Sequence, residues 1–271
     1  MLGCKNCALH HLLYVKYITY KMCYICALYI GFLRTKRHNA LKTLYNRYMN
    51  NPSTARILRP LIEKSKLREY KKGQIILYPG DVITSVFIVK KGAILLYDID
   101  DNGNTKVLYI LGKNSVFPLM SALDSPGASA AWFYEALEDT ELHMIPYTDF
   151  RECLHKDDGT IHRKLMQDFM DDVFELVTRI NSLSNGTSIM KLSGTLKFLA
   201  KKHGKSVAGT NWSRVNFPVS HQLLANMTGL TRETITHSIG TIQKADAIHY
   251  TRNSRLSINC KKLKKLETSL K

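Results

Sequence analysis

The sequence lacks the short motifs around which common enzyme active sites are built. It contains no glycine-rich phosphate loop, no Gly-x-Ser-x-Gly nucleophile elbow and no His-Glu-x-x-His zinc motif. Cys153, His155 and His162 are too few and too scattered to make a metal site. We therefore predict a protein that is not an enzyme and that binds neither a metal nor another cofactor.

Acidic residues are scarce at both ends of the chain. Residues 1–48 contain 8 Lys and Arg and no Asp or Glu, and residues 190–271 contain 15 against 3, a net charge of +12. Residues 49–189 are slightly acidic, with 16 basic residues against 19 acidic ones. The 271 residues leave room for two domains, and a strongly basic C-terminal third is typical of a nucleic-acid-binding domain attached to another domain.

Within the basic third, Val219–Tyr250 has the pattern of two short helices joined by a tight turn and followed by a β-wing. Ser220 is placed to cap the first helix, and Gly229 falls where the chain must turn, since glycine enters a left-handed conformation without steric cost. Thr231 is placed to cap the second helix. The apolar residues of that helix recur at steps of four and three: Ile235, Ile239 and Ile242.

The opposite face of the second helix carries polar residues suited to the edges of DNA bases: Arg232, Glu233, Thr236 and His237. Arg232 can donate two hydrogen bonds to guanine, and Glu233 can accept one from cytosine. One buried stripe beneath a polar N-terminal face is what a helix in the major groove needs. An ordinary helical hairpin with a solvated outer face is the alternative that the spacing alone leaves open.

The start of this helix, Leu-Thr-Arg-Glu-Thr-Ile at 230–235, resembles the recognition helix of the Crp/Fnr family of bacterial transcription regulators. The resemblance implies an N-terminal β-roll of the cyclic-nucleotide-binding type, a long dimerisation helix and a C-terminal winged helix-turn-helix. It implies base contacts for Arg232 and Glu233. His237 stands where the family often has a second base-contacting arginine, which is a departure from the family pattern.

Other residues around the turn and the wing are expected to touch the DNA backbone. Ser220, Thr231 and the arginines of the wing are placed to contact phosphate and so to set the register on the duplex. The complete set of predicted DNA-binding residues is Ser220, Thr231, Arg232, Glu233, Thr236, His237, Arg252 and Arg255.

The middle of the chain is rich in short strands separated by glycine turns. A helix over 56–66 is followed by apolar runs over 74–78, 86–89, 93–97 and 107–111, which predict four strands. Asn102-Gly103 predicts a tight hairpin between the last two strands. Lys-Lys-Gly-Gln-Ile-Ile, Pro-Gly-Asp and Val-Phe-Ile-Val-Lys-Lys-Gly are also similar to strands of the cyclic-nucleotide-binding fold, so the resemblance extends from about residue 53 to 258.

This middle domain lacks the residues with which the family holds a cyclic phosphate. The Gly-Glu pair of the family falls on Phe117-Pro118, and its arginine falls near Ala130. No Arg or Lys lies between Lys113 and Arg151, and a phosphate buried without a cation is strongly disfavoured. We therefore do not expect cAMP or cGMP as ligands. Four aromatic residues are expected in the core, with a pocket for another effector as the alternative: Phe117, Trp132, Phe133 and Tyr134.

The sequence predicts one long helix over Thr160–Ser184. Its apolar residues step by three and four, close to the period of a coiled-coil seam: Leu165, Phe169, Val173, Leu176, Ile180 and Leu183. Five charged residues are expected on a solvated outer face: Asp168, Asp171, Asp172, Glu175 and Arg179. The family uses this helix to pair two subunits, so the resemblance implies a homodimer. Packing of the stripe on the β-roll of the same chain is the alternative.

The first 48 residues carry two Cys-x2-Cys pairs: Cys4 and Cys7, Cys23 and Cys26. Three interpretations compete: a zinc or iron–sulfur site, a membrane or surface anchor, and a segment that does not belong to the natural protein. The apolar run Met22–Leu33 has 12 residues, too few to span a bilayer. We favour a natural start at Met49, because the residues after it fit the family pattern from the first helix onward.

We therefore expect an α+β protein with four parts. They are a basic N-terminal extension over 1–48, a β-roll sensor domain over 49–159, a dimerisation helix over 160–185 and a winged helix-turn-helix domain over 186–271. The expected function is sequence-specific transcription regulation by a cytoplasmic homodimer that binds double-stranded DNA, with RNA polymerase as a further partner and no membrane contact. The alternative is a small-molecule or redox sensor that acts mainly through protein contacts.

Overall fold

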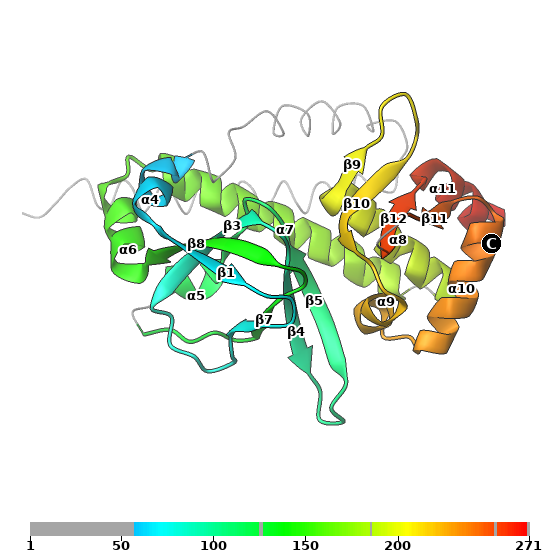
Figure 1. The fold of residues 1–271 in the computed structure, drawn as a ribbon, viewed down its shortest axis with the longest axis horizontal. Coiled ribbons are helices and arrows are strands. Elements are labelled where there is room, and N and C mark those ends of the chain that lie inside the picture. Colours follow the sequence, from blue (N-terminus) through cyan, green and yellow to red (C-terminus); the bar gives the residue numbers. More distant parts are fainter. Residues whose placement is uncertain (1–56, 125–126, 185, 252–253, 270–271) are drawn as a thin grey trace, which may run out of the picture. The chain divides into compact units, whose positions relative to one another are not determined.

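Two four-stranded antiparallel sheets form the roll that begins the described part of the chain (Figure 1). The computed structural model describes residues 57–124, 127–184, 186–251 and 254–269, which belong to one compact unit, Ser53–Lys271. The sheets have the strand orders β1-β8-β3-β6 and β2-β7-β4-β5. Their strands are β1 (Lys66–Tyr70), β2 (Ile75–Leu77), β3 (Ser85–Lys91), β4 (Ile94–Ile99), β5 (Thr105–Leu111), β6 (Val116–Phe117), β7 (Phe133–Ala136) and β8 (Thr140–Pro146).

A stack of three aromatic rings joins the two sheets inside the roll. Phe117 is 1% exposed, and its ring stacks on Phe87 at 5.3 Å and on Tyr134 at 5.2 Å between centroids. Phe87 and Phe117 belong to the first sheet and Tyr134 to the second. The core positions predicted for Phe117 and Tyr134 are confirmed. Phe133 is half-buried and stacks on Tyr97 at 4.9 Å.

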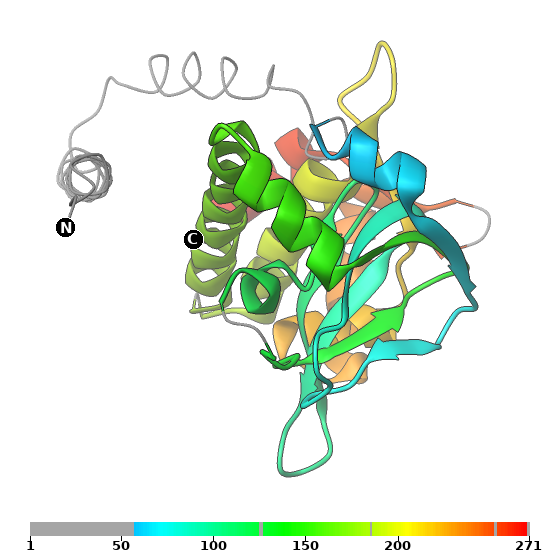
Figure 2. The same ribbon diagram turned by 90° about the vertical axis from the view of Figure 1, so that its left-hand side faces the viewer.

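The four predicted strands are present as β2, β3, β4 and β5, and the predicted hairpin joins β4 to β5. Gly103 takes the left-handed conformation there, with φ 78°. The carboxylate of Asp100 accepts from the backbone N–H groups of Asn104 at 2.9 Å and Asn102 at 3.0 Å, and these bonds help to lower the pKa of Asp100 to about 2. In Figures 1 and 2 this hairpin extends beyond the other strands of the roll.

Four helices accompany the roll: α4 (Arg59–Lys64), α5 (Leu119–Asp124), α6 (Tyr147–Lys156) and α7 (Thr160–Ser184). The bounds predicted for the long helix are those of α7. Ile161 and Leu165 are buried and belong to the hydrophobic core. Four large apolar side chains of α7 remain exposed to solvent and form a second stripe: Met166, Phe174, Val177 and Ile180.

The structure corrects the predicted faces of α7. Leu165, assigned to the seam between subunits, is 1% exposed and belongs to the core, whereas Ile180 is 63% exposed, as a seam residue should be. Arg179, assigned to the solvated face, is 7% exposed. The reason is that α7 has neighbours on two sides, the roll and α8, so that part of its charged face is covered.

The C-terminal part combines helices with a sheet of strand order β11-β12-β10-β9. Its elements are α8 (Ser188–His203), β9 (Gly204–Ser206), β10 (Ser213–Pro218), α9 (His221–Thr228), α10 (Arg232–Lys244), β11 (Ile248–Tyr250), β12 (Arg255–Ile258) and α11 (Cys260–Ser269). The predicted turn-linked helices and the wing are therefore present, whereas α11 was not predicted. None of the described helices is long and apolar enough to cross a membrane.

Candidate DNA-binding site

The turn between α9 and α10 is built from the capping residues that the sequence predicts. Ser220 accepts a hydrogen bond from the backbone N–H of Leu223 at 3.0 Å, and Thr231 accepts one from Thr234 at 3.2 Å. Gly229 ends α9 with φ 70°, in the left-handed region where a side chain is strained. These contacts fix the angle at which α10 leaves α9.

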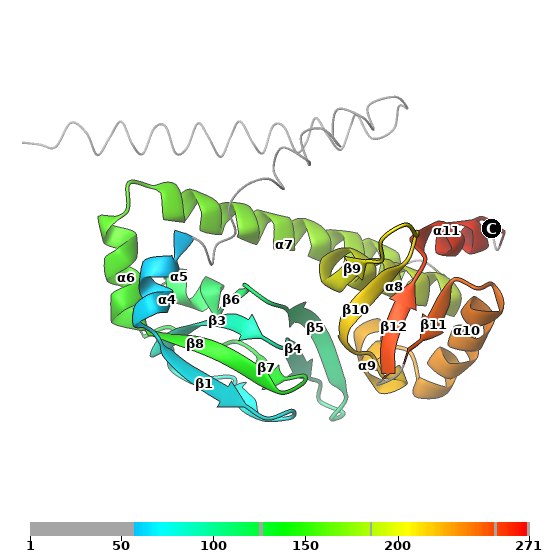
Figure 3. The ribbon, with the colours of Figure 1, turned by 45° about the horizontal axis from the view of Figure 1, so that its top comes forward.

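Helix α10 is anchored by its isoleucine stripe. Ile235 and Ile242 are 0% exposed and Ile239 is 2% exposed, and α10 packs against α9 and α8 (Figure 3). From α9, Leu224 and Met227 are buried in the same core. Replacing one such isoleucine by alanine costs about 2–5 kcal/mol, so the stripe holds the opposite face of α10 firmly in place.

The opposite face of α10 presents polar side chains to solvent. Arg232, Glu233, Thr236 and His237 are all exposed. Among the described residues, no hydrogen bond or ion pair engages the side chains of Arg232, Glu233 or His237. The face therefore offers a bidentate donor, a carboxylate acceptor and an imidazole, the groups that distinguish base pairs in the major groove.

Thr236 differs from its neighbours because its hydroxyl is already engaged. Its Oγ1 donates to the backbone oxygen of Arg232 at 2.9 Å and lies 2.9 Å from Nδ1 of His221. The ring of His221 also lies 5.9 Å from that of Tyr250 in β11, so one side chain links α9, α10 and the wing. His221 was not among the site residues predicted from the sequence. Its position directly after the N-cap Ser220 was the available signal.

The wing is tied to the start of α9 by a backbone hydrogen bond. The N–H of Val219 donates to the oxygen of Ser254 at 3.0 Å. Arg255 is exposed. Burial of Glu138 in the roll raises the pKa of that carboxyl, and the positive charge of Arg255 opposes the increase. Arg255 therefore lies near that carboxyl as well as at the wing. Arg252, the other predicted wing contact, lies outside the described residues.

Metal-ligating groups do not gather elsewhere in the part of the chain that the structure describes. No cluster of three or more His, Cys, Asp or Glu there could hold a metal ion. Cys153 and Cys260 are free thiols, and burial raises the pKa of both. The four N-terminal cysteines lie outside the described residues: Cys4, Cys7, Cys23 and Cys26.

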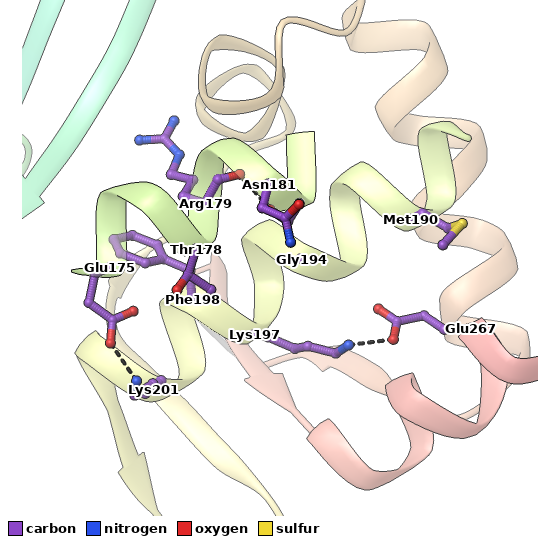
Figure 4. Close-up of a pocket in the computed structure, with 11 residues that line it drawn as sticks. Glu175, Thr178, Arg179, Asn181, Met190, Gly194, Lys197, Phe198, Lys201 and Glu267 are labelled. Atoms are coloured by element: carbon purple, nitrogen blue, oxygen red, sulfur yellow. Dashed lines mark hydrogen bonds and ion pairs between the residues drawn. The ribbon is translucent and has the colours of Figure 1, made fainter. Parts of the chain in front are cut away.

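A cavity of about 330 Å³ lies where α7, α8 and α11 meet (Figure 4). Two lysines of α8 line it, and a carboxylate holds each of them. Lys197 pairs with Glu267 of α11, and Lys201 pairs with Glu175 of α7. These ion pairs connect the long helix, α8 and the C-terminal helix.

Comparison with known proteins identifies both halves of the described chain. Residues 67–157 match the family model for the cyclic nucleotide-binding domain, and residues 191–268 match that for the Crp-like helix-turn-helix domain. The chain is 23% identical over 183 residues to the global nitrogen regulator of Synechococcus elongatus, covering 68% of this chain and 81% of that protein. It is 25% identical over 197 residues to the HTH-type transcriptional regulator ArcR of Staphylococcus epidermidis, covering 73% and 83%.

A solved structure shows the same order of elements. The structure of FixK2 from Bradyrhizobium japonicum superimposes with a TM-score of 0.63 at 19% sequence identity, covering 74% of this chain and 96% of that chain. The predicted α+β architecture, a β-roll followed by a long helix and a helix-turn-helix, is confirmed. The chain belongs to the Crp/Fnr family of DNA-binding transcription regulators.

Proposed function

We propose that this chain acts as a cytoplasmic homodimer, without catalysing a reaction, and that it reads DNA sequence with the N-terminal face of α10. One observation carries the proposal. The side chains of Arg232, Glu233 and His237 are exposed and make no hydrogen bond or ion pair among the described residues, and they lie on a helix whose other face is buried. Arg232 takes guanine and Glu233 takes cytosine. Thr236 completes this face, while Ser220, Thr231, Arg252 and Arg255 contact phosphate.

The proposed dimer is supported by the second apolar stripe of α7. Phe174, Val177 and Ile180 are 50%, 57% and 63% exposed, which is unusual for large hydrophobic side chains in one helix. Pairing two copies of α7 would cover them. A dimer would also present two recognition helices, which bind half-sites about 34 Å apart on one face of the duplex.

Successive parts of the chain have different proposed roles. Residues 49–159 form the sensor domain, 160–185 the dimerisation helix and 186–271 the DNA-binding domain, behind an extension over 1–48. RNA polymerase is the protein partner on which such a regulator would act. The proposed sensor does not take a cyclic nucleotide, because Phe117 is buried in the ring stack where the Gly-Glu pair of the family falls and Ala130 is 3% exposed where its arginine falls.

The test is the salt dependence of DNA binding by the full chain. Fluorescence anisotropy on labelled genomic fragments is measured between about 50 and 200 mM salt, a range over which six or more phosphate contacts weaken binding by about 10³-fold or more. We expect such a steep fall. Arg255→Gln should reduce the log–log slope by about 1, whereas Lys71→Gln, at an exposed site on the roll, should leave it unchanged. Weak, salt-independent binding would instead favour a sensor that works through protein contacts.

A further inference from the structure

Arg179 is a buried charge, although its place among charged residues of α7 predicts a solvated face. Its guanidinium donates to three backbone oxygens, those of Leu108, of Val107 at 2.6 Å and of Met227 at 2.7 Å. Leu108 and Val107 belong to β5 of the roll, and Met227 belongs to α9 of the DNA-binding domain. One side chain of the long helix therefore holds the roll and the DNA-binding domain together.

These oxygens are suited to a cation that has no carboxylate beside it. None of the ion pairs among the described residues joins Arg179 to a carboxylate. Met227 is one residue from the end of α9, where unsatisfied carbonyl groups give the helix a partial negative charge. Burial lowers the pKa of Arg179 to about 10, which leaves the guanidinium charged at neutral pH. The ring centroid of Phe198 in α8 lies 5.9 Å from the guanidinium carbon of Arg179, and the ring closes the site on that side.

The position of Arg179 on α7 connects these bonds to the exposed apolar stripe. Val177 and Ile180, two of the most exposed apolar residues of the structure, belong to the same turn of the helix. In Figure 4 the Arg179 guanidinium points away from Lys197 and Glu267. The turn of α7 that would pair with a second subunit thus also bonds directly to α9.

A three-residue connection, Gly229 to Thr231, separates α9 from α10, and its caps fix the angle between the two helices. The contacts that hold α9 against α7 therefore also determine the position of α10 relative to the exposed apolar stripe of α7. In a dimer, the two copies of α10 would be separated by a distance that these bonds determine.

We propose that Arg179 is a positioning residue that sets the distance between the two recognition helices of the dimer, and with it the half-site spacing that the protein accepts. The inference rests on the proposed function, since it requires a dimer that binds paired half-sites. Arg179 is buried and would not contact DNA itself. It acts by holding α9 to α7 and β5.

The test separates half-site recognition from spacing. The full-length chain first selects its site from random DNA, and a library then varies the number of base pairs between the two half-sites. We expect the unaltered protein to prefer one spacing at least tenfold over spacings changed by two or more base pairs. Arg179→Met, of similar length but uncharged, should bind an isolated half-site within threefold of the unaltered protein and should lose most of the spacing preference.

Lys202→Gln is the matched control. Lys202 also reaches α7, through Asp172 at 2.6 Å, and this pair does not involve α9, so its loss should leave the spacing preference intact. Should Arg179→Met fail to fold by circular dichroism, Arg179→Gln, a shorter side chain that keeps a donor, is measured in the same way. A variant that folds, dimerises and keeps the original spacing preference would overturn the inference. Failure of the unaltered chain to select any paired half-sites would instead count against the proposed function.

Discussion

His203 should make the stability of this protein fall as the pH is lowered from neutral. It is 6% exposed at the end of α8, and its ring packs against Gly112, where an added Cβ atom would lie 3.1 Å from Nδ1. Burial, followed by the positive charge of Lys202, lowers the pKa of His203 from 6.5 to about 4. A hydrogen bond with the backbone of Ile110 acts in the opposite direction and raises the pKa. The imidazole is therefore neutral in the folded protein at pH 7.

The size and sign of the effect follow from proton linkage. The unfolded chain takes up this proton near pH 6.5 and the folded chain only near pH 4, so the stability that the neutral ring supports is lost as the pH falls between these values. At pH 5 the loss relative to pH 7 is about 2 kcal/mol, approaching about 3 kcal/mol below pH 4.

The assay is urea unfolding at pH 7 and pH 5 for the unaltered chain and for His203→Gln, whose amide does not titrate. Other titratable groups, including His143, whose pKa burial lowers, are common to both proteins and cancel in the comparison. We expect the unaltered chain to lose about 2 kcal/mol more than the variant. Equal losses in the two proteins would refute the burial argument for His203.

The remaining predictions concern the DNA contact, the dimer and the turn. Arg232→Ala should cost about 1–3 kcal/mol of specific binding and relax the preference at one base position, measured by repeating the site selection with the variant. Val177→Glu, at a side chain 57% exposed, should yield a folded monomer by light scattering, and a variant that stays dimeric would argue against the α7 seam. Gly229→Ala, at φ 70°, should lower the unfolding free energy by about 1 kcal/mol. Gly240→Ala, inside α10 with open space around it, should raise the unfolding free energy by about 0.5–1 kcal/mol. Urea titrations that show changes of the same sign for both variants would contradict the conformational argument.

The recognition unit could be predicted from the sequence because its determinants are local. Ser220, Gly229 and Thr231 cap or turn the chain within a few residues of their own positions, and the steps between Ile235, Ile239 and Ile242 alone define a buried face. The same holds for the strands of the roll, where glycine turns separate apolar runs. Local rules therefore sufficed for the exposed face of α10 and for four strands of the roll, but not for β1, β6, β7, β8 or α11.

The environment of the charges could not be predicted in this way. Arg179 and Asp172 stand among other charged residues, and a sequence window does not distinguish a solvated side chain from one whose partners lie far along the chain. The partners of Arg179 are up to 72 residues away, and Asp172 accepts from Tyr109 at 2.7 Å, 63 residues away. The bond between His221 and Thr236 likewise spans 15 residues and two helices. Such contacts become visible only once the elements are packed.

The central claim, that α10 reads sequence as part of a dimer, is tested most directly by selection of bound DNA. The purified full chain is incubated with genomic fragments without any added ligand, and the bound fragments are sequenced. We predict recovery of a two-fold-symmetric motif with half-sites about one helical turn, ~34 Å, apart. Recovery of fragments without a shared motif, or of none at all, would contradict the claim.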